Sequence, residues 1–160
     1  MSSGESRRYL LLRGLLPPDT LFPPYYRVES DFVKCLQCEG KECLSNCPER
    51  VIQIREGVPV LNFSENGCTF CDKCAEACSG EVLKVEWRRE QIGIAMIDPR
   101  GCLAWRGIVC GSCGDACPKG VIEFTGLWNP IIREEGCTGC GFCLSVCPEP
   151  EAIKLFPVGG

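Results

Sequence analysis

Hydrophobic residues fall into short runs along the chain, and three stretches repeat one arrangement of them. Residues 51–63, 82–97 and 121–132 each contain a partly alternating β-branched run, a turn signal and a second run. Glu56-Gly57 and Thr125-Gly126 are two of these turn signals, and the whole arrangement is typical of a β-hairpin. Short helices are predicted over residues 72–82 and 141–153, where cysteines four positions apart share one helix face. The pattern therefore predicts an α+β fold with short helices and small antiparallel hairpins.

Cysteine changes this picture most, because the chain holds 16 cysteines among 160 residues and no histidine. The cysteines form four sets of four, and the first members of successive sets are 33, 34 and 35 residues apart. This near-constant period indicates four copies of one unit, each with a cysteine loop, a short helix and a strand. The sets are Cys35, Cys38, Cys43, Cys47; Cys68, Cys71, Cys74, Cys78; Cys102, Cys110, Cys113, Cys117; and Cys137, Cys140, Cys143, Cys147.

The second and fourth sets have the spacing C-x2-C-x2-C-x3-C, and Pro148 follows the fourth set. This run binds 4Fe-4S clusters in bacterial ferredoxins, where three cysteines hold one cluster and the fourth ligates the neighbouring cluster. Zinc sites instead separate two cysteine pairs by a dozen or more residues. Disulfides are not expected, because no secretory signal directs the chain to an oxidising compartment. The absence of histidine excludes Rieske centres and c-type haem attachment.

The first and third sets depart from this spacing. Four residues separate Cys38 from Cys43, seven separate Cys102 from Cys110, and Ser79 stands where the other three sets have proline. Because the entropic cost of closing a loop grows only with the logarithm of its length, we still expect four 4Fe-4S clusters with all sixteen cysteines as ligands. An alternative is that Cys102 lies too far out and leaves a three-iron cluster.

The pairing of the sets is a question of topology. Shorter connections favour a tandem arrangement, in which the first set pairs with the second and the third pairs with the fourth. The competing arrangement nests the second set with the third and the first with the fourth. The tandem ligand groups are Cys35, Cys38, Cys43 with Cys78; Cys68, Cys71, Cys74 with Cys47; Cys102, Cys110, Cys113 with Cys147; and Cys137, Cys140, Cys143 with Cys117.

The predicted domains are an N-terminal arm (1–30), a ferredoxin-like unit with the first two cysteine sets (31–88) and a second such unit (89–160). The arm begins with Arg7-Arg8 before "YLLLRGLL", which is similar to the start of a twin-arginine export signal. Arg13 and the Pro17-Pro18 pair interrupt the apolar stretch, and no small-residue cleavage site follows. We therefore expect a cytoplasmic protein, with periplasmic export as the alternative.

Charge and motif content exclude several functions. The formal charge of −4 argues against a nucleic-acid partner, and no apolar run approaches the length of a membrane span. Each bound cubane with its four thiolates adds about two negative charges, so four clusters would bring the total to about −12. No phosphate-binding loop, histidine base or nucleophile elbow is present, so the chain is predicted to carry electrons and not to be an enzyme.

Three segments together are more specific than the cysteine spacing. "ESRRYLLLRGLLPP", "CLAWRGIVCGSCGDACPKGVIEF" and "CTGCGFCLSVCPEPEAI" resemble the ferredoxin-type proteins of periplasmic nitrate reductase systems, the NapF type. The resemblance implies a cytoplasmic four-cluster protein that binds the molybdenum-containing catalytic subunit and assists its maturation. The alternative is a ferredoxin or subunit that transfers single electrons for another redox enzyme.

Overall fold

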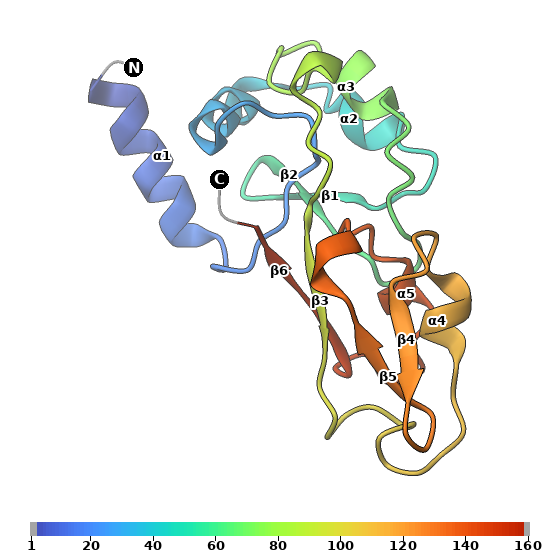
Figure 1. The fold of residues 1–160 in the computed structure, drawn as a ribbon. Helices are drawn as coiled ribbons and strands as arrows, with labels where there is room; N and C mark the ends of the chain where they lie inside the picture. The colour runs from blue at the N-terminus through green and yellow to red at the C-terminus, as the bar shows by residue number, and fades with distance from the viewer. Residues whose placement is uncertain (1–2, 159–160) are drawn as a thin grey trace. The chain divides into compact units, whose positions relative to one another are not determined.

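The structure, a computed structural model, describes residues 3–158 and the side chains from residue 7 onward. The chain forms two compact units (Figure 1). The first unit contains residues 3–62 and 70–90, and the second contains residues 63–69 and 91–158. The short segment 63–69 therefore belongs to a different unit from the residues on either side of it.

The first unit combines short helices with one hairpin. Strand β1 (Ile52–Arg55) pairs antiparallel with β2 (Val58–Leu61), and Ile52 lies opposite Leu61. Glu56 and Gly57 both adopt positive φ in the turn, as the Glu-Gly signal predicted. The helical elements are α1 (Ser3–Leu15), the 3₁₀ helix η1 (Glu29–Gln37), α2 (Glu42–Ser45), α3 (Lys73–Glu76) and the 3₁₀ turn η2 (Val85–Trp87).

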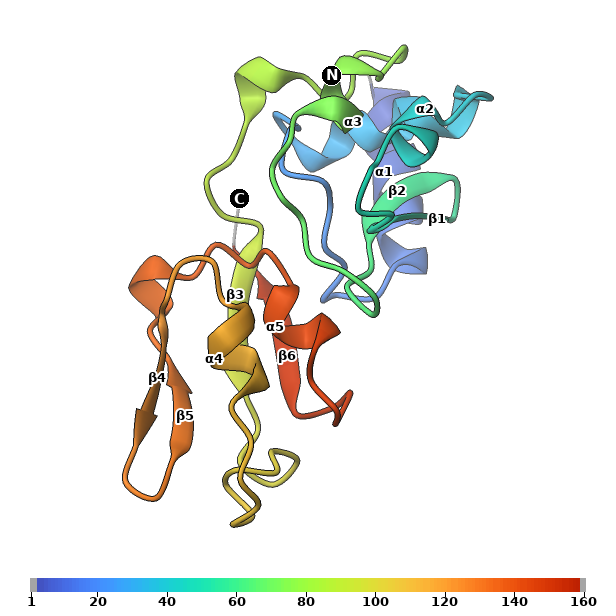
Figure 2. The ribbon, with the colours of Figure 1, turned by 90° about the vertical axis from the view of Figure 1, so that its right-hand side faces the viewer.

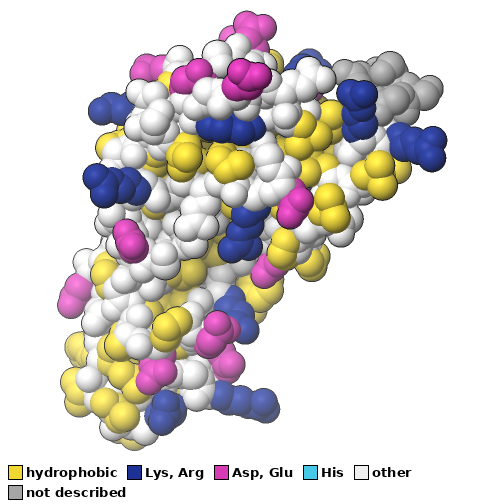
Figure 3. All heavy atoms as spheres, turned by 180° about the vertical axis from the view of Figure 1, so that it is seen from behind, with side chains coloured by type: hydrophobic (Ala, Val, Ile, Leu, Met, Phe, Trp, Pro, Cys, Tyr) yellow, Lys and Arg dark blue, Asp and Glu magenta, His cyan; other side chains and the backbone are white. Residues whose placement is uncertain are grey.

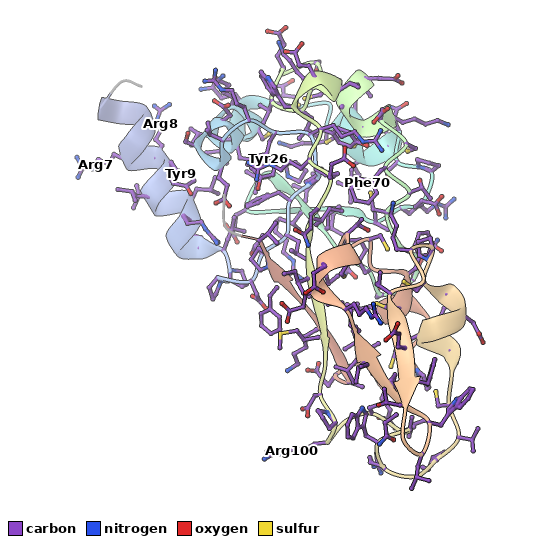
Figure 4. All side chains as sticks on the ribbon, viewed as in Figure 1. Arg7, Arg8, Tyr9, Tyr26, Phe70 and Arg100 are labelled. Atoms are coloured by element: carbon purple, nitrogen blue, oxygen red, sulfur yellow. The ribbon has the colours of Figure 1, made fainter. Side chains whose placement is uncertain are left out.

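The N-terminal arm supplies much of the first unit's core. Leu12 on α1 is buried, and Figure 4 shows Tyr9 on the side of α1 that faces η1. The Tyr9 hydroxyl donates to Glu29 on η1 at 3.0 Å. Phe22 stacks on Phe32 with ring centroids 4.3 Å apart. Residues 21–26 are all buried, so this part of the arm belongs to the core of the first unit.

Tyr25 ties this segment to the cysteine loops. Its side chain is 1% exposed, and its hydroxyl accepts a hydrogen bond of 3.1 Å from the backbone N–H of Asp72. Burial is the main reason that the pKa of Tyr25 lies above its ordinary value. The backbone N–H of Lys84 donates to the Tyr25 carbonyl at 2.8 Å.

The second unit contains two small antiparallel sheets. Strand β3 (Gly93–Ile97) pairs with β6 (Ile153–Pro157), and β4 (Ile122–Thr125) pairs with β5 (Asn129–Ile132). Helices α4 (Ser112–Ala116) and α5 (Phe142–Ser145) lie side by side, as Figure 2 shows, and the 3₁₀ turn η3 (Glu134–Gly136) precedes the fourth cysteine set. The predicted α+β class is confirmed, and the hairpins at 52–61 and 122–132 lie where the sequence pattern placed them.

The hairpin predicted over residues 82–97 is wrong. Within this stretch the backbone N–H groups of Lys84 and Arg89 donate to the carbonyls of Tyr25 and Pro24, at 2.8 and 2.7 Å. Lys84 and Arg89 therefore bond to the arm and not to a second strand, and β3 pairs with the distant strand β6. The two predicted helices also differ, since α3 and α5 are single turns of four residues.

Gly139 occupies a position that excludes other residues. Its φ is +67°, and a Cβ atom there would overlap the backbone N and O of Gly93. We expect Gly139→Ala to lower the free energy of unfolding of the iron-loaded protein by about 2–4 kcal/mol, because both the φ value and the close contact oppose it. Chemical denaturation with far-UV circular dichroism measures this change.

Gly120 is the matched control, because its φ is +61° and no other atom lies within 4 Å of the place that a Cβ would take. Gly120→Ala carries only the backbone cost, about 1 kcal/mol. Equal losses in the two variants would show that the close approach of Gly139 to Gly93 is unimportant.

Candidate metal centres

Four cysteines of the first unit lie within electrostatic reach of one another. Burial, followed by the neighbouring Cys78, Cys43 and Cys38, raises the pKa of Cys35 to about 12, against the opposing charge of Lys41. Burial likewise raises the pKa of Cys43 to about 11, with Cys78 as the next cause. The structure thus brings Cys78, the last cysteine of the second set, to the first set. The group is Cys35, Cys38, Cys43 and Cys78.

The gap residues of the first set hold this loop in place. The Lys41 ammonium donates to the carbonyls of Cys35 and Gly57, the latter at 2.7 Å. Its neighbour Glu42 accepts a hydrogen bond of 3.0 Å from the hydroxyl of Ser79. Hydrogen bonds from its own backbone and from Ser79 lower the pKa of Glu42. The four-residue gap therefore anchors the loop in three places.

A pocket in the second unit is lined by the last three-cysteine loop and by one cysteine of the third set. It encloses about 340 Å³ of empty space, including the part open to solvent. Burial, together with the neighbouring cysteines, raises the pKa of Cys143 to about 12. The backbone N–H of Ala95 points to the Cys137 sulfur at 3.5 Å. The lining cysteines are Cys117, Cys137, Cys140 and Cys143.

A second pocket of this unit shows the reciprocal arrangement. It encloses about 360 Å³ on the same measure and is lined by Pro130 and Ile153 as well as by cysteines. Burial raises the pKa of Cys113 to about 11 and also raises that of Cys147. The seven-residue gap does not keep Cys102 away from its partners. The lining cysteines are Cys102, Cys110, Cys113 and Cys147.

The remaining predicted group, Cys47, Cys68, Cys71 and Cys74, is divided between the units. Cys68 belongs to the second unit, where its backbone N–H donates to the Cys140 carbonyl at 2.6 Å. Cys47, Cys71 and Cys74 belong to the first unit, and Cys71 is exposed. This fourth ligand group stays a prediction. Among residues 3–158 the structure offers no group of three His, Cys, Asp or Glu side chains that could hold a single metal ion.

The two pockets suit a cluster that takes four thiolates. Each is lined by four cysteines and otherwise mainly by apolar side chains, and in each the third cysteine of a set, Cys143 or Cys113, is buried. Backbone N–H groups reach sulfur at Ala95–Cys137 and, in the first unit, at Leu83–Cys78 with 3.4 Å between the atoms. Such donors offset the negative charge of an iron–sulfur cluster and raise its potential.

Sequence reasoning missed some contacts that shape the centres. The Gln91 side-chain amide donates to the Cys137 carbonyl at 2.7 Å, and a Cβ on Gly141 would overlap the Phe63 ring. These partners are 46 and 78 positions apart in the sequence, so cysteine spacing carries no signal for them. The Glu42–Ser79 pair, 37 positions apart, was missed for the same reason.

Acidification is expected to release iron from the loaded protein. In the folded chain without iron, the raised pKa of Cys35 and Cys143 favours their neutral thiol forms. The contribution of these neutral thiols to the stability of the fold is complete below pH 9.0 and is lost as pH rises through about 12. Iron has the opposite requirement, since each ligand must give up its proton, and protons therefore compete with iron as pH falls. Visible absorbance in the presence of a ferrous chelator is expected to fall faster at about pH 5 than at about pH 8. Equal rates at both values would contradict this prediction.

Comparison with known proteins agrees with the geometry. The model of the 4Fe-4S dicluster domain matches residues 106–150, which hold the last seven cysteines of the two pockets just described. The chain is 32% identical to the ferredoxin-type protein NapF of Escherichia coli K12, over 92% of this chain and 93% of that protein. The chain belongs to the NapF family of ferredoxin-type proteins. As a NapF-type protein it is an iron–sulfur protein of electron transport.

Other ferredoxin-type proteins are similar over most of the NapF-type chain. The methylamine utilization ferredoxin-type protein MauM of Methylobacillus flagellatus is 28% identical, over 92% of this chain and 73% of its own. The ferredoxin-type protein NapG of Escherichia coli K12 is 28% identical, over 86% of this chain and 71% of its own. Within residues 3–158 of the NapF-type chain, no helix has both the length and the apolar character to span a bilayer.

Proposed function

We propose that the chain binds four 4Fe-4S clusters through its sixteen cysteines and transfers single electrons between redox proteins. The observation that carries the proposal is the exchange of last cysteines between the third and fourth sets, seen in both pockets of the second unit. This exchange is the ligand pattern of two-cluster ferredoxins and supports the tandem pairing over the nested one. It also supports Cys102 as a ligand of a complete cubane.

The chain's own residues have three tasks in this function. The cysteine thiolates hold the metal, and the apolar side chains that line the pockets reduce its contact with water. Backbone N–H groups such as those of Ala95 and Leu83 stabilise the added electron by pointing at ligand sulfurs. A bound cluster supplies reversible one-electron chemistry, and no described residue has to accept or donate a proton in that step.

Metal analysis tests this part of the proposal. Anaerobically purified protein is expected to be brown, to contain about 16 iron atoms and about 16 sulfides per chain, and to give an EPR signal on reduction. Colourless protein with about four zinc ions would overturn it in favour of structural zinc.

For the cellular role, we propose that the protein acts in the cytoplasm as a maturation factor for the molybdenum-containing catalytic subunit of periplasmic nitrate reductase. Similarity to NapF along nearly the whole chain supports this role. The exposed Arg7 and Arg8 on α1 offer a contact for an acidic surface of that subunit, and Figure 4 shows Arg7 directed away from η1. A fusion of the full chain to a reporter that is active only in the cytoplasm tests the location.

Binding to the purified catalytic subunit tests the role of the arm. Deleting residues 1–30 is unsuitable, because Phe22, Tyr25 and Tyr26 are core residues of the first unit. The double variant Arg7→Glu with Arg8→Glu changes only exposed side chains, and we expect it to weaken binding at least tenfold at low salt. Wild-type protein that does not bind the subunit overturns the proposed role. Unchanged binding by the variant would show that Arg7 and Arg8 take no part in binding the catalytic subunit.

MauM favours a second candidate function. That relative is named for methylamine utilization, so similar chains occur outside nitrate metabolism. On this reading the protein is a ferredoxin that serves another redox enzyme, and the catalytic subunit of nitrate reductase would bind neither the wild type nor the arm variant.

A further inference from the structure

A group of exposed hydrophobic side chains lies beside the pocket of Cys102, Cys110, Cys113 and Cys147. Its members come from the seven-residue gap of the third cysteine set and from the turn between β4 and β5. Figure 3 shows hydrophobic side chains gathered at the lower left, where the second unit ends. We call this group the apolar lobe; it consists of Trp105, Ile108, Val109, Leu127 and Trp128.

Contacts within the second unit join the two halves of the lobe. The indole N–H of Trp105 donates to the Pro130 carbonyl at 3.0 Å, so the gap is fixed to β5. Pro130 lies opposite Phe124 in the sheet, and Phe124 stacks on Trp128 with ring centroids 4.9 Å apart. Gly114 leaves room for this stack, since a Cβ there would lie 2.5 Å from the Phe124 ring. The lobe is therefore a built surface that joins loop and hairpin.

Two members of the lobe contribute almost nothing to the packing of the unit. Val109 is 92% exposed and Leu127 is 94% exposed. Contiguous exposed apolar surface is costly in water and on soluble proteins marks sites of interaction. Val109 immediately precedes Cys110, so a molecule seated on the lobe lies one residue from an iron ligand.

The size and charge of the lobe indicate the kind of partner. Its five side chains expose of the order of 600 Å², which is within the range of transient electron-transfer interfaces and below the roughly 800 Å² per partner of a standard stable complex. None of the five carries a charge, and Arg106 within the gap is paired with Glu149 at 3.9 Å. An uncharged surface of this size suits an apolar partner surface and a transient complex.

We propose that the apolar lobe is the surface on which a redox protein docks to exchange electrons through the cluster of Cys102, Cys110, Cys113 and Cys147. This inference rests on the proposed function, and it takes the molybdenum-containing catalytic subunit as the partner. One electron leaves the reduced cluster and is gained by the metal centre of the partner. No bond is formed or broken, and no proton has to move.

The double variant Val109→Ser with Leu127→Ser tests the proposal in the full-length, iron-loaded protein. Both side chains are more than nine-tenths exposed, so the fold and the iron content are expected to stay unchanged. Binding of the purified catalytic subunit is expected to weaken at least tenfold, and the oxidation of pre-reduced protein by that subunit is expected to slow by a similar factor. The loss is expected to be nearly the same at low and high salt, because the lobe is uncharged.

Phe156→Ser is the matched control, since Phe156 is a 45% exposed hydrophobic residue on β6 of the same unit and lines neither pocket. The control is expected to bind like the wild type. Equal binding by wild type and lobe variant overturns the docking surface and leaves the proposed function standing. No binding by the wild type overturns both. A wild-type dimer in sedimentation that the lobe substitutions dissociate would also overturn the proposal, because the lobe would then serve a second copy of the chain.

Discussion

Removal of iron is expected to unfold both units of the protein. Each unit has fewer than about 90 residues, a size at which the hydrophobic core alone provides little stability and metal commonly provides the rest. Cysteines are themselves core residues, since Cys35, Cys43 and Cys74 are buried in the first unit and Cys113 and Cys143 in the second. The free energy of metal binding is then part of the free energy of folding.

Anaerobic chelation followed by near-UV circular dichroism and amide hydrogen exchange measures this effect. We expect loss of the near-UV signal and of slow exchange in both units, with recovery when iron and sulfide are restored. Incubation with the same chelator at a concentration too low to extract iron is the control. A metal-free chain that keeps slowly exchanging amides in β1, β2, β3 and β6 would contradict the prediction.

Pairs of cysteine substitutions are expected to reveal that each cluster of the second unit takes its fourth ligand from the other set. Cys147→Ala alone is expected to cost one cluster and to lower iron from about 16 to about 12 atoms per chain. Adding Cys113→Ala is expected to cost nothing more, because both residues line the same pocket. Adding Cys143→Ala instead removes a ligand of the other pocket and is expected to leave about 8 iron atoms.

The two double variants are matched controls for each other, because each combines Cys147→Ala with a second alanine at the third cysteine of a set. Iron and sulfide analysis gives the count, and EPR shows whether a three-iron cluster survives in place of a lost one. The reverse result, with further loss for Cys113 and none for Cys143, would mean that each set holds its own cluster.

The sequence predicted the local architecture well where the signals were local. Glu56-Gly57 gave a turn of two positive-φ residues, and the run around Thr125-Gly126 gave the β4–β5 hairpin. The shorter connections also favoured pairing the third set with the fourth, and each pocket of the second unit is lined by three cysteines of one set and the last cysteine of the other.

The sequence pattern did not predict features that depend on contacts between residues far apart in the chain. Residues 82–89 have the composition of a strand, yet their backbone bonds to Pro24 and Tyr25 replace a hairpin. The prolines and tyrosines at 23–26 carry no periodic pattern that separates core from surface positions, yet all four residues are buried. The Glu42–Ser79 pair and the apolar lobe likewise join positions that are remote in the sequence.

The position of residues 63–69 has a consequence for how the gene can be cut. A fragment ending at residue 90 would contain residues 63–69 without their partners. Among these partners are the Cys140 carbonyl, which accepts from the Cys68 N–H, and Gly141, which lies against Phe63. A fragment starting at residue 91 would lack residues 63–69. Neither fragment therefore contains a complete unit. During synthesis, residues 63–69 can pack in the second unit only after residues 91–158 have emerged from the ribosome.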